Sequence, residues 1–301
     1  MPGSPRMRVL GNSRKYKKAL LRVIREVAKF PRIWHLNRTN RRSSECITGN
    51  APVVVSLTTH GRRIRDVHLT IESIAAGRRR PSELILWLDR PDDIANLPSE
   101  IIRLKARGLR VEIAENLGPH TKYFPALDGC IRQDVPLVTA DDDILYPTSW
   151  LEKLLIAAGR HPEDVTCYKS RRVLIRNGDF APYQQWPENW STQPSPVVFA
   201  LGVSGVFYPV RMLKELARRG REFVDCCPRA DDIWLHYVAL TAGVAVRQLD
   251  RAPVHFASVP NEGEALSIGN VALGGNDSQI VATYDPVTIE RMAAVRDDVR
   301  G

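Results

Sequence analysis

The sequence has no long run of apolar residues and few cysteines. No stretch approaches the roughly 20 apolar residues that a membrane-spanning helix needs, and the basic N-terminus lacks the uninterrupted apolar segment of a signal peptide. An odd number of cysteines, with no CxxC pair and no regular framework, favours a reducing compartment. These five cysteines are Cys46, Cys130, Cys167, Cys226 and Cys227. We therefore expect a cytoplasmic protein.

Several catalytic signatures are also missing. The sequence contains no GxGxxG, no HExxH, and no GxSxG around Ser204, so it lacks the short motifs of dinucleotide binding, zinc proteolysis and serine hydrolysis. Cys226 and Cys227 have His236 nearby in sequence, but nothing indicates a nucleophile.

Positive charge is concentrated in one part of the chain. The net charge is +9, and residues 1–50 hold 13 Lys and Arg against two acids, Glu26 and Glu45. The remaining residues hold 30 basic against 32 acidic side chains, so the body is close to neutral. Aromatic residues do not alternate with the basic ones, which argues against a specific nucleic-acid partner.

Residues 1–50 are predicted to form a basic extension with one helix. Between Lys15 and Phe30 apolar residues recur at helical spacing, basic residues occupy the remaining surface, and Pro31 is expected to end the helix. Residues 37–50 have the composition of a linker. The helix either packs on the body or lies on an anionic membrane through residues 15–35, with Trp34 at the interface; the pattern leaves both open.

From Ala51 the chain alternates strands and helices. β-branched or apolar runs suited to buried strands alternate with helical patterns four times. This rhythm predicts an α/β fold with a mostly parallel central sheet, which binds ligands at the carboxyl ends of its strands. The predicted strands begin at Ala51, Ser82, Leu109 and Val135.

Three consecutive aspartates follow the fourth strand, in the segment LVTADDDILYP, residues 137–147. Because side chains alternate along a strand, Asp141 and Asp143 should point one way and Asp142 the other. Two carboxylates held this close require a cation, and an all-oxygen pair suits Mg²⁺ or Mn²⁺ better than zinc. The alternative is an acidic turn in which Asp143 caps the helix that begins near Ser149.

Two later segments carry further candidates. Gly202 and Gly205 interrupt a strand, which predicts either close approach of the backbone to a ligand or a bulge. Asp231 and Asp232 begin a predicted helix, a favourable place for carboxylates even without a function.

Together these pieces resemble a nucleotide-sugar glycosyltransferase of the GT-A fold, of the bacterial type assigned to surface polysaccharide or glycan assembly. The resemblance rests on VVVSLTTHGRRI, TIESI, ELILWLD, LGPHTKYFPAL and TADDDILYP, and covers most of residues 52–285. It implies a GT-A domain over residues 51–285 and a C-terminal tail over residues 286–301.

The resemblance implies a donor site. Asp143, and Asp141 directly or through water, would hold Mn²⁺ or Mg²⁺ on the diphosphate, with His255 as a further metal ligand. Asp89 would bind the base or ribose and Lys122 a phosphate. A turn aspartate and a solvated helix lysine are the alternatives for these two residues.

The remaining donor-binding candidates are Asp142, Gly202 and Gly205. Uridine diphosphate is the carrier that the resemblance implies, and the acceptor is a glycan, a lipid-linked glycan or a protein.

The resemblance also implies an acceptor site at the predicted helix start. Asp231 and Asp232 stand where the family more often has Glu-Asp, and Asp232 is the candidate base that accepts the proton of the acceptor hydroxyl. In a retaining enzyme it would instead position the acceptor.

Two other functions compete with this interpretation. A haloacid dehalogenase-type phosphatase also has DxD after a strand, but in its first strand and with Thr or Val where this chain has Leu145. A degenerate GT-A fold that only binds a sugar nucleotide, nucleic acid or membrane is the second alternative.

Overall fold

The computed structural model describes residues 29–260 and 275–295, and the chain divides into two compact units, Met1–Ser43 and Ser44–Gly301. In the first unit, residues 29–42 are helical. The predicted helix end at Pro31 is therefore wrong, as is a linker beginning at residue 37. A proline removes its own N–H hydrogen bond but does not prevent the following residues from being helical. Residues 15–28 of the predicted helix lie outside the described residues.

The second unit is built on a seven-stranded sheet with the order β12-β6-β11-β4-β1-β2-β3. β11 runs antiparallel to β4 and β6, and the other neighbouring strands are parallel. The predicted α/β class with a mostly parallel sheet is confirmed. The strands are β1 (Ala51–Thr58), β2 (Pro81–Leu88), β3 (Leu109–Ile113), β4 (Leu137–Thr139), β6 (Val165–Cys167), β11 (Val206–Tyr208) and β12 (Val246–Gln248).

Short strand pairs join the loops outside this sheet. β5 (Ile144–Leu145) pairs with β13 (Ala257–Ser258), β7 (Ser170–Arg172) with β10 (Val198–Ala200), and β8 (Ile175–Arg176) with β9 (Asp179–Phe180).

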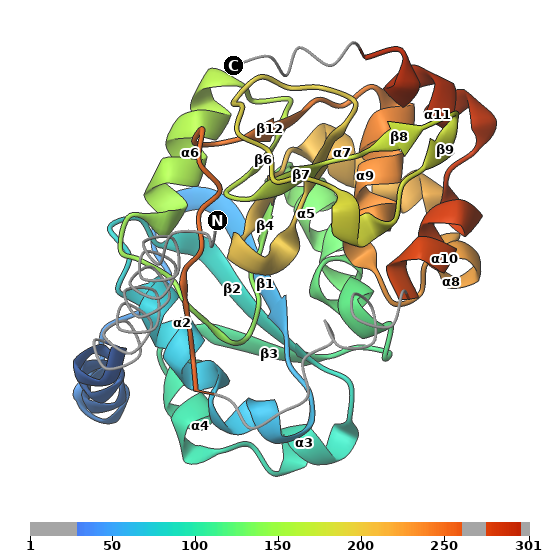
Figure 1. The fold of residues 1–301 in the computed structure, drawn as a ribbon. Helices are drawn as coiled ribbons and strands as arrows, with labels where there is room; N and C mark the ends of the chain where they lie inside the picture. The colour runs from blue at the N-terminus through green and yellow to red at the C-terminus, as the bar shows by residue number, and fades with distance from the viewer. Residues whose placement is uncertain (1–28, 261–274, 296–301) are drawn as a thin grey trace, which may run out of the picture. The chain divides into compact units, whose positions relative to one another are not determined.

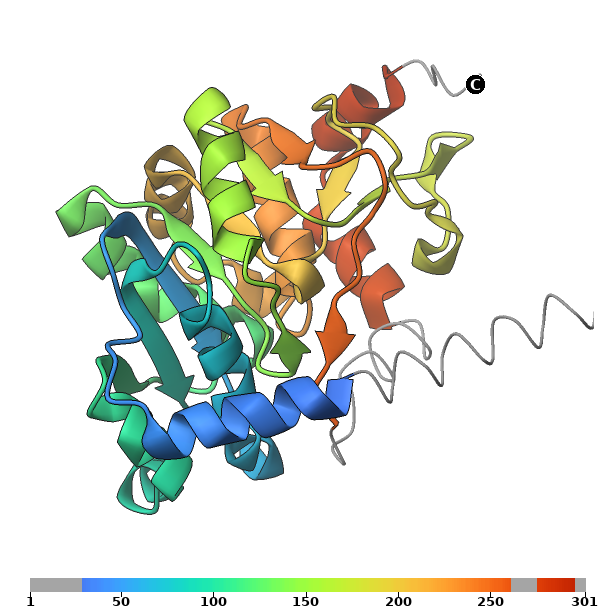
Figure 2. The ribbon, with the colours of Figure 1, turned by 90° about the vertical axis from the view of Figure 1, so that its left-hand side faces the viewer.

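Helices cover both faces of the sheet, because the strand residues that point to either face are apolar. Val54 on β1 belongs to the core shared with α5, α7 and α9, whereas its neighbours Val53 and Val55 belong to the core shared with α2, α4 and α6. Figure 1 shows α2 and α6 on one side of the strands and α7 and α9 on the other, and Figure 2 has α6 in front of the strands. The helices are α2 (Val67–Ala75), α3 (Pro91–Ala95), α4 (Ser99–Lys105), α5 (Leu127–Gln133), α6 (Trp150–Arg160), α7 (Val210–Arg219), α8 (Phe223–Cys226), α9 (Asp231–Ala242), α10 (Gly275–Thr283) and α11 (Pro286–Ala293).

Two predicted elements differ from the structure. The helix expected from Thr121 consists of two 3₁₀ turns, η2 (Gly118–Lys122) and η3 (Phe124–Ala126), before α5 begins. Pro119 and Pro125 each start such a turn and cannot donate to an earlier carbonyl. The strand expected around Gly202 is β10, a 3₁₀ turn η5 (Gly202–Ser204), and then β11.

The predicted boundary at residue 285 falls between α10 and α11. α11 buries Met292 in the same core as α9. None of the described helices has the length and apolar character that crossing a bilayer requires.

Candidate active site

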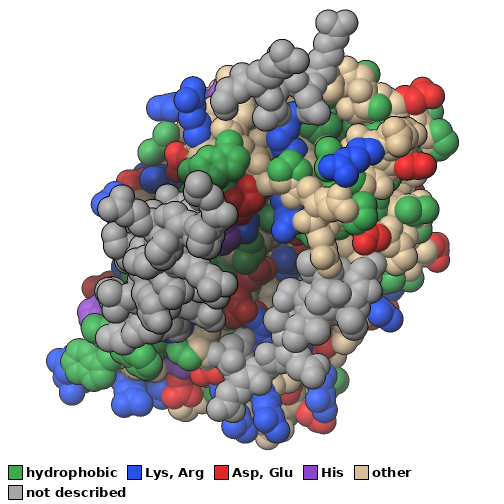
Figure 3. Space-filling view, viewed as in Figure 1, with side chains coloured by type: hydrophobic (Ala, Val, Ile, Leu, Met, Phe, Trp, Pro, Cys, Tyr) green, Lys and Arg blue, Asp and Glu red, His purple; other side chains and the backbone are tan. Residues whose placement is uncertain are grey.

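Acidic and basic side chains meet where β4 ends. β4 stops at Thr139, and residues 141–143, which we call the aspartate turn, lead into β5 through a turn at residues 142 and 143. The Asp141 N–H donates to the Tyr146 hydroxyl at 2.9 Å, and the Val259 N–H donates to the Asp143 carbonyl at 2.7 Å. The turn is therefore held from both sides, and Figure 3 shows charged side chains gathered in a hollow of this face.

Asp142 points into the protein. Its Oδ2 accepts a hydrogen bond from Thr59 Oγ1 at 2.6 Å, and its Oδ1 lies 2.8 Å from Arg63 Nη2. Burial raises the pKa of Asp142 to about 6, although Arg63 and Thr59 act in the opposite direction. These contacts make Asp142 an anchor of the turn, and its predicted role in donor binding stays a prediction.

Asp141 and Asp143 point outward, as strand alternation predicts, with side chains 26% and 31% exposed. Asp141 Oδ1 accepts from Lys122 and Asp143 Oδ2 from Arg63. Burial raises the pKa of Asp143, and Arg63 opposes this shift. Each carboxylate makes these side-chain contacts through one oxygen and remains partly exposed, so a ligand can reach it. Partly exposed carboxylates of this kind fit Mg²⁺ or Mn²⁺.

Lys122 joins this turn to the start of α9. Its Nζ lies 3.1 Å from Asp141 Oδ1 and 3.1 Å from Asp231 Oδ2, and the residue is buried. Burial alone would lower the pKa of Lys122, but the carboxylates of Asp141, Asp231 and Asp232 outweigh burial and raise it well above its usual value. Ser56 on β1 donates to the Lys122 carbonyl at 2.7 Å. A charged ammonium is thus held between the two groups of aspartates.

Asp232 faces the glycine turn. The Gly202 N–H donates to Asp232 Oδ1 at 3.0 Å. Burial raises the pKa of Asp232 well above its usual range, Asp231 raises it further, and Lys122 acts against both. A Cβ added at Gly202 would lie 3.0 Å from Lys122 Nζ and 3.2 Å from Asp232 Oδ1. A side chain at this position would crowd both charged groups, so glycine lets them approach the backbone.

At Gly205 a different contact excludes a side chain. Its φ is +91°, and an added Cβ would lie 2.7 Å from the Trp150 ring. Trp150 Nε1 also donates to the Ser204 carbonyl at 2.9 Å. The close approach expected at this glycine is therefore to Trp150 of α6, and a contact with a ligand stays a prediction.

Asp89 directly follows β2, at the same edge of the sheet. Its Oδ1 is buried and has no hydrogen-bond partner among the described residues. A buried carboxylate oxygen without a donor is costly, so a ligand hydroxyl or N–H would satisfy it. This agrees with the predicted contact to a base or ribose without testing it.

His255 lies on the surface, with its side chain 62% exposed. Its Nε2 is 3.5 Å from Glu188 Oε1, and its Nδ1 is 3.4 Å from Lys169 Nζ. The described residues contain no group of three or more His, Cys, Asp or Glu side chains arranged to hold a metal ion. The structure thus does not bring His255 into such a group with the aspartates.

The sequence interpretation missed Arg63 and Thr59. Both follow β1, at the same edge of the sheet as Asp89 and the aspartate turn. The position after a strand end was a usable signal, since the segment GRRIR directly follows the strand. The pattern does not say which of its three arginines points inward.

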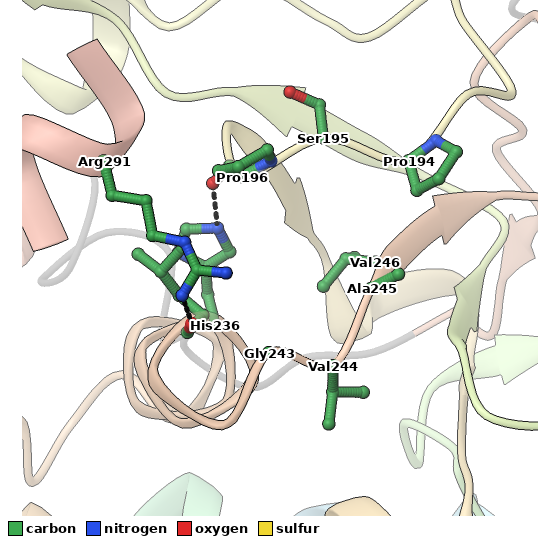
Figure 4. A pocket seen from close by; sticks show the side chains of 10 residues that line it. Pro194, Ser195, Pro196, His236, Gly243, Val244, Ala245, Val246 and Arg291 are labelled. Carbon is green, nitrogen blue, oxygen red and sulfur yellow. Dashed lines mark hydrogen bonds between the residues drawn. The ribbon is translucent and has the colours of Figure 1, made fainter. Parts of the chain in front are cut away.

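A cavity of about 220 Å³ lies elsewhere in the unit and contains none of the predicted site residues. Figure 4 shows it at the C-terminal end of α9, lined mainly by apolar side chains. His236 Nε2 contacts the Pro196 carbonyl, and Arg291 donates to the Leu240 carbonyl. The polar groups at its wall are thus bound to the protein itself.

Comparison with known proteins finds similarity in structure. No protein-family model matches the chain, and no curated protein matches it. TarS 1-349 of S. aureus, solved in complex with UDP-GlcNAc, superposes with a TM-score of 0.52 at 15% identity, over 81% of this chain and 71% of that one. The mannosyltransferase PcManGT from Pyrobaculum calidifontis, in complex with GDP-Man and Mn²⁺, gives 0.45 at 17% identity, over 80% and 68%.

At these identities the comparison concerns the fold. The chain shares with TarS a GT-A-type, Rossmann-like architecture, with a mostly parallel central sheet flanked by helices. The GT-A fold expected from the sequence is confirmed.

Proposed function

We propose that the chain is a metal-dependent glycosyltransferase that moves a sugar from a nucleoside diphosphate to an acceptor hydroxyl. The observation that carries this proposal is the Lys122 ammonium, which lies 3.1 Å from both Asp141 and Asp231. A donor-side and an acceptor-side group of carboxylates are thereby adjacent at the edge of the sheet where this class of fold binds ligands.

The donor half of the site would consist of Asp89, Lys122, Asp141 and Asp143. Asp141 and Asp143 would hold Mg²⁺ or Mn²⁺, which supplies Lewis-acid stabilisation of the negative charge that develops on the leaving diphosphate. Lys122 stays protonated beside these carboxylates and would add a second positive charge near the same oxygens. His255 remains a predicted ligand, although its ring contacts Glu188 and Lys169 in this structure.

The acceptor half would consist of Asp232, which the Gly202 N–H orients. In an inverting reaction the acceptor oxygen bonds to the anomeric carbon, the bond to the diphosphate breaks, and its electron pair stays on the phosphate oxygen. Asp232 takes the proton of the attacking hydroxyl. In a retaining reaction Asp232 would only position the acceptor.

The donor we propose is a UDP-sugar, and the acceptor a glycan, a lipid-linked glycan or a protein. The resemblance of the sequence motifs suggests uridine diphosphate, and the TarS structure with the similar fold contains UDP-GlcNAc.

Contact with a membrane surface is proposed for the N-terminal unit. In its described part Phe30 and Trp34 are 59% and 65% exposed. The guanidinium of Arg38 lies 5.7 Å from the Trp34 ring centroid. Exposed aromatic rings beside arginines suit the interface of an anionic bilayer.

Thermal unfolding with UDP, GDP, CDP or no nucleotide, each with Mn²⁺ and with EDTA, tests the proposal. A ligand that binds the folded state stabilises it by about 2.7 kcal/mol at a hundred times its Kd, enough to raise Tm by several degrees. We expect UDP to raise Tm in Mn²⁺ and not in EDTA. A nucleotide shift that EDTA leaves unchanged would favour the degenerate binding module, and no shift at all would contradict donor binding.

A further inference from the structure

Arg63 contacts one of the two carboxylates proposed to hold the metal. It belongs to η1 (Gly61–Arg65), the 3₁₀ turn that directly follows β1. Its Nη2 lies 2.8 Å from Asp142 Oδ1 and also contacts Asp143 Oδ2, and its side chain is 14% exposed. One guanidinium nitrogen therefore binds two consecutive carboxylates of the aspartate turn.

The arrangement around Arg63 is incomplete. Its Nε is buried and has no hydrogen-bond partner among the described residues. An unsatisfied buried N–H is costly, so the described position does not satisfy every donor of this guanidinium. An anionic ligand with several oxygens, such as a diphosphate, would supply the missing acceptors, because arginine binds phosphate oxygens with two N–H groups at once.

The two carboxylates differ in how firmly they are held. Asp142 is buried and also accepts from Thr59, whereas Asp143 is partly exposed. A divalent cation would therefore bind Asp143, and would either share this carboxylate with Arg63 or displace Arg63 from it. A cation on Asp143 would also be repelled by the guanidinium a few ångströms away.

We propose that Arg63 is a positioning residue of the donor site. This inference rests on the proposed function. In the absence of donor, Arg63 holds Asp143 and acts as its counter-ion. When the metal and the sugar nucleotide bind, Arg63 keeps Asp142, releases Asp143 to the metal, and turns its freed N–H groups to the diphosphate.

Mn²⁺ binding to the full-length protein tests this exchange without an activity assay. Free Mn²⁺ is followed by electron paramagnetic resonance, without nucleotide, for wild type, Arg63→Gln and Arg65→Gln. Arg65 lies on the same turn but is exposed, and its variant is the matched control. We expect Arg63→Gln to bind Mn²⁺ on the order of tenfold more tightly than the other two, because a competing positive charge is gone. At saturating Mn²⁺ the same variant should bind UDP about tenfold more weakly, because the arginine contact to phosphate is lost.

The outcomes separate this inference from the proposed function. If wild type and Arg63→Gln bind both Mn²⁺ and UDP with equal affinity, the role of Arg63 is contradicted and the glycosyltransferase proposal stands. If none of the proteins binds Mn²⁺, the metal and the exchange are both contradicted.

A second variant serves if Arg63→Gln does not fold. Circular dichroism shows whether Arg63→Gln is folded, and Arg63→Lys replaces it if it is not. Arg63→Lys keeps the charge, so its Mn²⁺ affinity should stay within about threefold of wild type. Its UDP affinity should fall, because an ammonium is a point charge without the planar fork. Unchanged UDP affinity would contradict the proposal.

Discussion

Lys122 is charged inside the protein because three carboxylates surround it, and this arrangement couples the two halves of the site. Its ammonium opposes the rise in the pKa of Asp232 that burial and Asp231 produce. A base must be ionised to accept a proton. If Asp232 is the base, as we propose, its pKa, raised well above the usual carboxyl range, would set the pH above which it accepts a proton.

Replacing Asp232 by asparagine tests this role. The amide keeps an oxygen for the Gly202 N–H but cannot take a proton, so we expect kcat to fall about 10²–10⁴-fold with UDP affinity retained. In wild type, activity should rise with pH through the raised pKa of Asp232. In Lys122→Met the rise in activity should shift to higher pH, because the variant lacks the positive charge that lowers the pKa of Asp232. If Asp232→Asn also loses UDP binding, the residue is structural.

Individual residues show how far the sequence can be interpreted. The outward direction of Asp141 and Asp143 was predicted from strand alternation, but β4 ends at Thr139 and the following turn directs them. Their place at the sheet edge followed from the βα rhythm. Arg63 was missed because Arg62, Arg63 and Arg65 are equivalent in sequence, and only packing of the turn directs one of them inward. Whether a side chain points into the site therefore depends on contacts between segments that are distant in sequence.

Among the elements, α9 holds both the proposed acceptor-side carboxylates and a buried histidine. Its first turn holds Asp231 and Asp232, where the helix dipole favours negative charge. One turn further along lies His236, which is buried. Its Nδ1 contacts the Tyr284 hydroxyl at 2.6 Å and its Nε2 the Pro196 carbonyl at 3.0 Å. Burial lowers the pKa of His236 from 6.5 to about 4.

This shift predicts a loss of stability in acid. Because the pKa in the folded state is lower, its contribution to stability is present above pH 6.5 and is lost as pH falls toward 4. The loss is roughly 3 kcal/mol over this window, at 1.36 kcal/mol per pH unit. His236→Gln, which does not titrate, should flatten this part of the pH dependence of the free energy of unfolding in urea. The surface variant His161→Gln is the control, and an unchanged slope in His236→Gln would contradict the account.

Elements with one strong pattern were predictable, and those made of short turns were not. α9 was expected from its acidic start and apolar faces. One helix was expected from Thr121 to Ile131, but its first part forms 3₁₀ turns, the second of which contains Pro125, and α5 begins only at Leu127. One of those turns positions Lys122. The glycine segment likewise separates into β10, η5 and β11, and Gly205, with a φ of +91°, packs against Trp150.

At the scale of the whole molecule, the charges are divided between the N-terminal segment and the body. Residues 1–50 carry a net charge of +11, from 13 basic and two acidic side chains, and the remainder carries −2. The division was evident in the sequence. The sequence did not show that the helix continues past Pro31, because a proline can end a helix or lie within one.

Vesicle binding tests the proposed membrane contact. The full-length protein should sediment with vesicles that contain anionic phosphatidylglycerol and be released by added salt, since surface charges are screened. A double variant, Phe30→Ser with Trp34→Ser, should bind more weakly while its Tm stays unchanged. Equal binding to neutral phosphatidylcholine vesicles, or no effect of the double variant, would contradict this contact.

Asp141 and Asp143 are proposed to serve the transfer of a sugar from a nucleotide. Release of UDP from UDP-sugars, in Mn²⁺ and in EDTA, measures it most directly when wild type is compared with Asp143→Asn. We predict release that requires Mn²⁺ in wild type and falls at least about 100-fold in Asp143→Asn, because stabilisation of the leaving group is lost, while Tm without ligand is unchanged. Release at the wild-type rate in Asp143→Asn, or release that EDTA does not affect, would contradict the account.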